Sequence, residues 1–187
     1  METNQQQLQL ELTTLEATER VGHLLGAWLQ AGDLVILTGA LGAGKTTLTQ
    51  SLGEGLEVRS GIISPTFVLS RHHPSLVEGP GLVHVDAYRL QAGGEIDTLD
   101  LESTLGENVT VVEWGIGKVE HLSESRLEIS LDREQLAPKT AAPWEESEDE
   151  LDEPRSMVIR GIGPRWAEGN FQRLANALEL AVGEGAA

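Results

Sequence analysis

The stretch LVILTGALGAGKTTLTQSLG, Leu34 to Gly53, joins an apolar run of strand length to a glycine-rich turn and a segment of helical character. The turn matches the pattern G-x-x-x-x-G-K-[ST] at every fixed position, from Gly39 to Thr46. Its place after a buried strand and before a helix is the context in which this pattern forms a phosphate-binding loop. The stretch therefore predicts a domain of the P-loop nucleotide-binding type.

The composition of this loop predicts a nucleoside triphosphate as the ligand. Glycines let the backbone approach a phosphate closely, and the amides and the helix N-terminus supply positive potential. We expect Lys45 to bridge the β- and γ-phosphates and Thr46 to bind Mg²⁺. The residues expected to contact the nucleotide are Gly39, Leu41, Gly42, Ala43, Gly44, Lys45, Thr46 and Thr47.

Two carboxylates are candidates for the second anchor that Mg²⁺ requires. Asp86 follows the apolar run LVHV, and Glu113 follows VTVV. Both would lie at the carboxyl ends of parallel strands, on the same edge as the phosphate loop, where ligands bind in open α/β sheets. One could hold the metal and the other could orient or deprotonate the attacking water, and these residues alone do not decide between the two assignments. An ordinary strand-end carboxylate at the surface is the alternative for either.

Three further residues carry weaker expectations. Thr66, in the segment SPTF, is placed like the threonine of a GTPase switch that senses the γ-phosphate, although a capping turn explains the segment equally well. From its own position, Trp114 is expected to pack in the core. His84 is expected to be an ordinary strand residue.

Strand and helix patterns alternate along the chain, which predicts an α/β fold: a P-loop NTPase-like sheet, mostly parallel with antiparallel additions and helices on both faces. A capping box at Thr13 and Glu16 is expected to begin the first helix. Strands are expected at 8–12, 34–38, 81–88, 108–114, 126–131 and 156–162, an extended segment at 64–73, and helices from the capping box to about 30, from 45 to about 55, and at 95–105 and 167–182.

Length and composition indicate one domain spanning residues 1–187. The formal net charge of −17 argues against direct binding of nucleic acid, which needs clustered Lys and Arg. No apolar run approaches about 18 residues and no signal peptide is read, so a soluble cytoplasmic protein without membrane contact is expected. Seven of the nine residues from 145 to 153 are acidic, and the surrounding segment, about 137–155, is expected to be a disordered insert or, alternatively, an acidic docking tag.

The absence of other signatures narrows the class of P-loop protein. The chain has no Asn-Lys pair, so the guanine-binding motif N-K-x-D of Ras-like GTPases is missing. No segment resembles the Arg-rich lid that a small-molecule kinase closes over the transferred phosphate. A small-molecule kinase of the P-loop class nevertheless remains the alternative interpretation of the function. What these residues favour is a minimal NTPase with switch-like loops.

Four motifs, GALGAGKTT, SPTF, HVDAYRL and VVEWG, follow one another between Gly39 and Gly115. In this order and at these short spacings, they closely resemble the TsaE (YjeE) family, the bacterial ATPases of tRNA threonylcarbamoyladenosine biosynthesis. The pattern of strands and helices extends the resemblance from about Leu12 to Ala181.

The resemblance implies a compact P-loop α/β domain that hydrolyses ATP slowly with Mg²⁺. It implies a TsaB–TsaD heterodimer as the partner, in which TsaD transfers the threonylcarbamoyl group to adenosine 37 of tRNAs that read ANN codons. Contact with tRNA would be indirect, through these partners, and the ATPase cycle is expected to reset the partner complex between turnovers.

The resemblance also implies roles for individual residues. By their match to the family motifs, Lys45 and Thr46 bind phosphate and metal, and Thr66 lies in a switch-like loop that takes part in catalysis. The match to Asp86 implies a role in hydrolysis, and the match to Glu113 implies the metal-binding carboxylate. The match to Trp114 implies a functional position, which we expect to contact the nucleotide.

Overall fold

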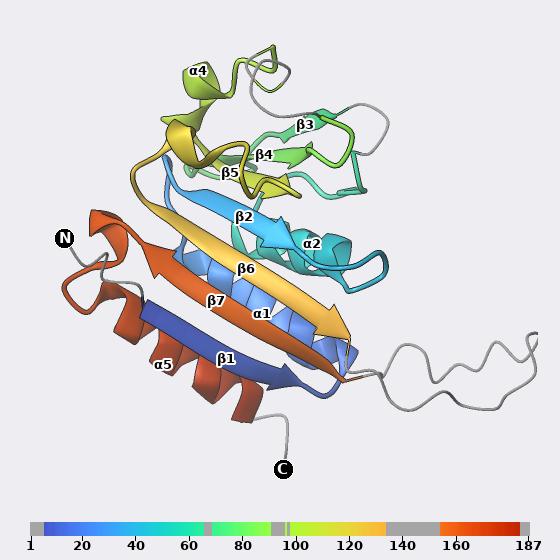
Figure 1. Ribbon diagram of the computed structural model, residues 1–187, viewed down its shortest axis with the longest axis vertical. Coiled ribbons are helices and arrows are strands. Elements are labelled where there is room, and N and C mark those ends of the chain that lie inside the picture. The colour runs from blue at the N-terminus through green and yellow to red at the C-terminus, as the bar shows by residue number, and fades with distance from the viewer. Residues whose placement is uncertain (1–5, 66–68, 91–95, 97, 134–153, 184–187) are drawn as a thin grey trace, which may run out of the picture.

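A seven-stranded sheet with strand order β1-β7-β6-β2-β5-β4-β3 forms the centre of the protein. The structure, a computed structural model, describes residues 6–65, 69–90, 96, 98–133 and 154–183 (Figure 1). The strands are β1 (Gln6–Leu12), β2 (Leu34–Thr38), β3 (Ser70–His73), β4 (Gly81–Asp86), β5 (Asn108–Glu113), β6 (Arg126–Arg133) and β7 (Arg155–Ile162).

The sheet is parallel at its centre and antiparallel at its edges. Strands β6, β2, β5 and β4 run parallel to one another. On one side β3 pairs antiparallel with β4, and on the other β7 pairs antiparallel with β6 and β1 with β7. The prediction of a mostly parallel α/β sheet with antiparallel additions is confirmed.

Helices cover the two faces of the sheet unequally. Figure 1 shows α1 (Leu15–Trp28), α2 (Lys45–Gly55) and α5 (Asn170–Gly183) behind the sheet, where they enclose the larger core. On the opposite face, α4 (Leu101–Leu105) and the turn that leads into the 3₁₀ helix η1 (Glu120–Leu122) cover β2, β5 and β4 through a smaller core. A second 3₁₀ helix, η3 (Pro164–Trp166), precedes α5. The expectation of helices on both faces is confirmed.

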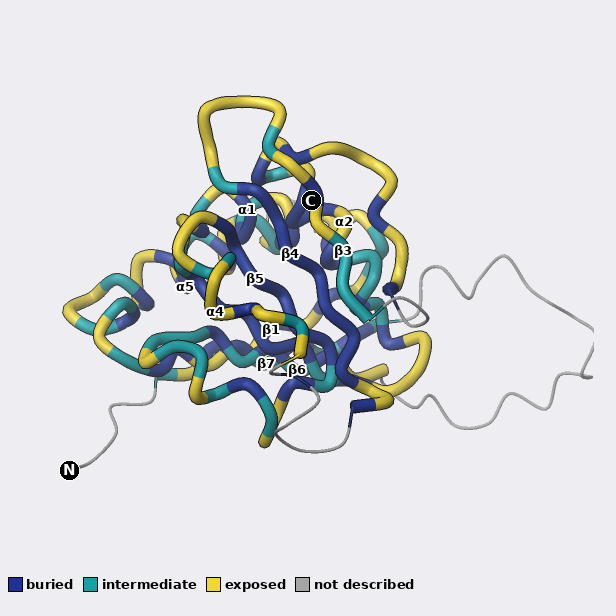
Figure 2. Tube along the Cα trace, turned by 90° about the horizontal axis from the view of Figure 1, so that it is seen from above, coloured by how far each residue is buried: buried dark blue, intermediate teal, exposed yellow. Residues whose placement is uncertain are grey.

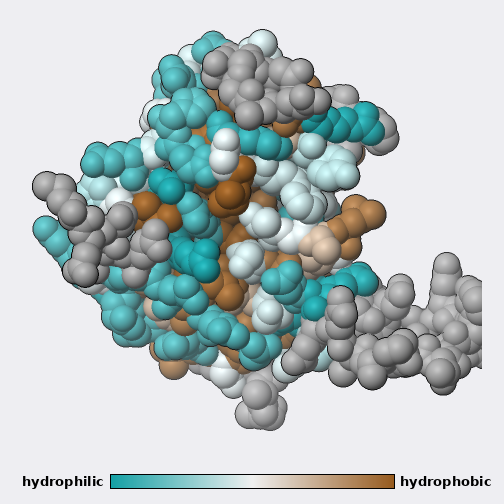
Figure 3. Space-filling view, in the orientation of Figure 1, coloured by the Kyte–Doolittle hydropathy of each residue, from teal (hydrophilic) through white to brown (hydrophobic). Residues whose placement is uncertain are grey.

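Among the described residues, no helix covers the other face of β1, β7 and β6. Along these strands buried residues alternate with half-buried or exposed ones, as period-2 patterning requires for a sheet with one covered face. Figure 3 shows hydrophilic residues over much of this face, whereas Figure 2 shows the central strands buried and the exposed residues gathered mainly in the loops.

Close contact between α1 and α2 fixes the position of α2, and therefore of the loop before it. A Cβ added at Gly26 would lie 2.1 Å from the carbonyl oxygen of Leu52, and one at Gly55 would lie 2.0 Å from that of His23. The two helix backbones can approach this closely only because both positions are glycine.

Several element boundaries differ from the sequence predictions. The cap of α1 is Thr14 and not Thr13, because the Thr14 hydroxyl accepts the Ala17 N–H at 3.2 Å. The helix predicted at 95–105 is confirmed only in part: Ile96 and α4 are helical, but Thr98 and Leu99 form a turn and Asp100 adopts φ 49°, which interrupts helical geometry before α4. Of residues 91–95 and 97 the structure describes nothing.

The other boundaries shift by a few residues. The extended segment predicted at 64–73 forms a strand only in β3, and the strand predicted to reach residue 88 ends at Asp86. The last helix begins at Asn170, because Glu168 and Gly169 have positive φ. Most of the acidic insert lies outside the described residues, but Arg155, its predicted last residue, already belongs to β7.

Within the described part of the chain, no helix combines the length and the apolar character that a membrane crossing demands.

Candidate functional site

The phosphate loop joins the end of β2 to the start of α2, as the sequence predicts. Three of its glycines have positive φ: 155° at Gly39, 77° at Gly42 and 103° at Gly44. Residues with a Cβ adopt such angles only under strain, so the path of the loop depends on glycine. Gly44 is the N-cap residue of α2. Because glycine has no side chain that could accept a hydrogen bond, no N-cap side chain occupies the first N–H groups of this helix, which face the loop.

Lys45 is held inside this loop. Its Nζ donates to the carbonyl oxygens of Gly39 at 2.8 Å and Ala40 at 3.0 Å, and it lies 4.7 Å from the centre of the Trp114 ring. The Lys45 side chain is buried, so solvent and salt screen its positive charge only weakly.

Asp86 and Glu113 lie at the ends of two adjacent parallel strands. They are paired in register across β4 and β5, and both are buried. An Asp86 carboxylate oxygen accepts the backbone N–H of Tyr88 at 2.9 Å. The structure therefore brings both candidate carboxylates to the edge of the sheet that carries the phosphate loop.

His84, which is expected from the sequence to be an ordinary strand residue, contacts Glu113. Its Nε2 lies 2.9 Å from Oε1 of Glu113, and the imidazole has no exposed surface. The sequence carries only part of the signal: residues two apart on a strand point to the same face, so His84 is expected to share a face with Asp86, but its contact with Glu113 depends on the strand order.

Trp114 lines the site, so the expectation of core packing is wrong. Its φ of 59° turns the chain immediately after β5, and the residue is half-buried. The ring contacts Tyr88, with centroids 5.4 Å apart, and covers the ammonium group of Lys45. The left-handed backbone directs this ring over the loop and away from the two cores.

These residues surround one cavity of about 590 Å³. Two of the predicted loop residues, Gly39 and Ala43, do not line it: Gly39 is buried beneath Lys45, and Ala43 packs in the larger core. Thr66 lies outside the described residues, although Ser64 nearby lines the cavity. The lining residues are Leu41, Gly42, Gly44, Lys45, Thr46, Thr47, Ser64, Asp86, Tyr88, Glu113, Trp114 and Arg155.

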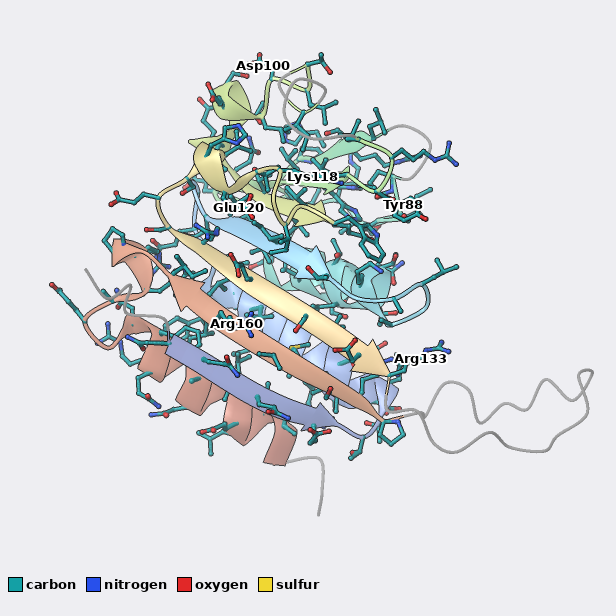
Figure 4. The ribbon with its side chains drawn as sticks, in the orientation of Figure 1. Tyr88, Asp100, Lys118, Glu120, Arg133 and Arg160 are labelled. Atoms are coloured by element: carbon teal, nitrogen blue, oxygen red, sulfur yellow. The ribbon has the colours of Figure 1, made fainter. Side chains whose placement is uncertain are left out.

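Two arginines flank the phosphate loop on the side opposite to the carboxylates. The Nε–H of Arg133 donates to the carbonyl oxygen of Gly42 at 2.9 Å. Arg155 lies beside Gly44: a Cβ added to Gly44 would be 3.3 Å from the Nε atom of Arg155. The pair faces each other across β6 and β7. Figure 4 shows Arg133 and Tyr88 on either side of the loop between β2 and α2. Neither arginine could be assigned to the site from the sequence, because β6 and β7 are distant in sequence from the loop.

The donor set suits Mg²⁺ bound together with a nucleotide. Thr46, Asp86 and Glu113 supply hard oxygen ligands around one cavity. Within the described ranges, no group of three or more His, Cys, Asp or Glu side chains is arranged so that it could hold a metal ion. Mg²⁺ typically uses one or two carboxylates with substrate phosphates, so this arrangement fits a metal that arrives with its nucleotide.

The turn after Trp114 is closed by Glu120. Its carboxylate accepts the backbone N–H groups of Gly117 at 2.6 Å and Val119 at 3.1 Å. Partial burial raises the pKa of Glu120, but these backbone hydrogen bonds and nearby Arg126 outweigh it and leave the pKa below its ordinary value. The ionised carboxylate therefore stabilises the turn that supports Trp114.

Comparison with known proteins gives a consistent set of relatives. The family model "Threonylcarbamoyl adenosine biosynthesis protein TsaE" matches residues 12–141. A tRNA threonylcarbamoyladenosine biosynthesis protein TsaE from Streptomyces coelicolor is 51% identical over 156 residues, covering 83% of this chain and 97% of the relative. A protein of the same name from Mycobacterium tuberculosis is 43% identical over 140 residues, covering 71% of this chain and 83% of the relative.

A solved structure has the same fold. The crystal structure of Bacillus subtilis YdiB superposes with a TM-score of 0.64 at 26% sequence identity, covering 94% of this chain and 96% of that one.

Proposed function

The chain belongs to the TsaE family of threonylcarbamoyl adenosine biosynthesis proteins, and from this premise we propose that it is a Mg²⁺-dependent ATPase that acts with a TsaB–TsaD complex. In this proposal it supports formation of N6-threonylcarbamoyladenosine at position 37 of tRNAs that read ANN codons, and it does not itself transfer the group. The names of the relatives support this role over that of a small-molecule kinase.

The observation that carries the proposal is the meeting of one buried ammonium group and two buried carboxylates around a single cavity. Lys45 comes from the phosphate loop, whereas Asp86 and Glu113 come from neighbouring strand ends. A cation for the phosphates and paired carboxylates for metal and water are the parts that phosphoryl transfer to water requires.

Each residue has a definite task in this proposal. Lys45, together with the amides at the start of α2, binds the β- and γ-phosphates. Thr46 and Glu113 hold the metal, which, when bound, offsets negative charge that develops on the phosphates. Asp86 orients the attacking water and accepts its proton. Trp114, in contact with Tyr88, covers the ammonium group of Lys45 on one side of the site.

The charge of the chain supports indirect contact with tRNA. A formal net charge of −17 repels phosphate backbones at long range, so the partners would bind the RNA.

Nucleotide binding and turnover by Lys45→Ala test the proposal. We expect loss of measurable turnover and ATP affinity at least about tenfold weaker, since a charge at the phosphates is removed. The melting temperature should stay near that of the parent chain. Arg160→Ala is the control, because it removes a cation on the open face of the sheet (Figure 4). Full turnover by Lys45→Ala would refute the proposal.

A further inference from the structure

His84 and Glu113 form a buried pair that the proposed reaction does not use directly. The two residues come from neighbouring strands, with Nε2 of His84 2.9 Å from Oε1 of Glu113, and their side chains are 0% and 4% exposed. We propose that His84 is a positioning residue, which holds the Glu113 carboxylate in the orientation that binds Mg²⁺. This inference rests on the proposed ATPase function.

The chemistry of the pair defines the direction of the hydrogen bond. A carboxylate oxygen accepts, so the bond requires a proton on Nε2 of His84. Among the described residues, no other hydrogen bond reaches the Glu113 carboxylate, so Oε2 is left for the cavity that Glu113 lines. The imidazole thus fixes one oxygen and leaves the other for a ligand.

The imidazole has no other polar role within the described residues. Its Nδ1 has no hydrogen-bond partner there. A buried polar atom without a partner costs free energy, so an apolar side chain of similar size would suit general packing better. The bond to Glu113 is therefore the feature that distinguishes histidine from leucine at this position.

The position of the bond across the strands explains why it matters for geometry. His84 pairs in register with Val111, and Glu113 pairs with Asp86, so the bond runs diagonally between β4 and β5. It ties the long Glu113 side chain to the strand that also carries Asp86, two residues further on. Hydrogen bonds to metal ligands of this kind typically change metal affinity by about 10–100-fold when they are lost.

The test uses the full chain and Mn²⁺ as a spectroscopic substitute for Mg²⁺. ATP affinity is measured without metal, and Mn²⁺ binding to the ATP-loaded protein is followed by electron paramagnetic resonance. We expect His84→Leu to bind metal-free ATP within about twofold of the parent, since Lys45 is untouched, but to bind Mn²⁺ about 10–100-fold more weakly. His84→Gln, whose amide can replace Nε2–H, should recover most of the Mn²⁺ affinity.

His73→Leu is the matched control, because it removes a buried imidazole of the same sheet that has no hydrogen bond to Glu113. It should leave Mn²⁺ affinity unchanged. If His84→Leu does not fold, His84→Asn and His84→Gln replace it: the shorter Asn amide should fail to support Mn²⁺ binding while Gln supports it.

Two results would overturn the inference. Parent-like Mn²⁺ affinity in His84→Leu, or in His84→Asn, would overturn it alone and leave the ATPase proposal intact. Failure of the unsubstituted chain to bind ATP at all would overturn the ATPase proposal and this inference with it.

Discussion

Asp86 and Glu113 are register partners at the ends of β4 and β5, and each carboxylate has a different hydrogen-bond donor. Asp86 accepts a backbone N–H from Tyr88, whereas Glu113 is bonded to the imidazole of His84. The two carboxylates are similarly buried but accept hydrogen bonds from different donors, which supports the assignment of different functions to Asp86 and Glu113.

Substitution of the two carboxylates should separate these tasks. We expect Asp86→Asn to bind ATP and Mg²⁺ like the parent and to lose about 10²–10⁴-fold in turnover, because the group that accepts the water proton is removed. Glu113→Gln should instead raise the Mg²⁺ concentration needed for half-maximal turnover. Steady-state kinetics over a Mg²⁺ titration checks both. Normal turnover by Asp86→Asn would refute its assignment to hydrolysis.

Trp114 should report nucleotide binding by fluorescence. Its ring lies over Lys45 and against Tyr88, so phosphates bound to Lys45 will change its surroundings. We expect ATP to change the intrinsic fluorescence of the parent chain and not that of Trp114→Phe. ATP affinity should change by less than about fivefold, because phenylalanine keeps an aromatic face over the ammonium group.

Trp28→Phe is the control for this measurement, since Trp28 packs against the larger core on α1. It should retain the ATP-dependent signal. An undiminished signal in Trp114→Phe would show that the nucleotide does not bind beside this ring.

Gly26→Ala should destabilise the fold. The added methyl group would meet the carbonyl oxygen of Leu52 at 2.1 Å and force α1 and α2 apart. Overpacking of this kind typically costs about 1–3 kcal/mol in the free energy of unfolding. Urea unfolding measures this cost, with Gly106→Ala as the control, because no atom beyond the adjacent residues lies within 4 Å of a Cβ added there. Equal stability of the two variants would contradict the close helix contact.

Stability should depend on pH through Glu120. Its pKa is below the ordinary value in the folded chain, so its contribution is fully present above the unfolded pKa of 4.5 and is lost as the pH falls through the folded pKa. We expect Glu120→Gln to lower the free energy of unfolding by about 1 kcal/mol at pH 7, where two backbone hydrogen bonds to a charged group are weakened.

Urea unfolding of this variant and the parent over a pH series checks the prediction. The difference between the two should shrink once the pH falls below 4.5. Glu179→Gln, on the exposed surface of α5, provides the comparison. A constant difference down to acidic pH would show that the charge of Glu120 does not stabilise the turn.

The phosphate loop and the strand ends that carry the carboxylates could be predicted from the sequence, because each depends on a pattern of residues that are close together in the chain. The strand, glycine turn and helix from Leu34 to Gly53 form one continuous unit, and its glycines have the backbone angles that the motif requires. The apolar runs before Asp86 and Glu113 identified strand ends, and parallel pairing then placed both at one edge.

The parts that depend on strand order could not be predicted. His84 and Glu113 are 29 positions apart, and Arg133 is 91 positions from Gly42, so no local pattern relates them. The break at Asp100 was missed for a different reason: apolar spacing favoured a continuous helix, whereas the aspartate takes a left-handed conformation.

ATP turnover by the purified chain, measured alone and after addition of cognate TsaB and TsaD, tests the proposed role most directly. We predict low turnover alone, a clear rise when both partners are present, and no turnover under either condition for Lys45→Ala. Turnover that requires Lys45 but is indifferent to the partners would contradict a partner-coupled ATPase. A rise in ADP production with one acceptor metabolite would then point to the kinase reading.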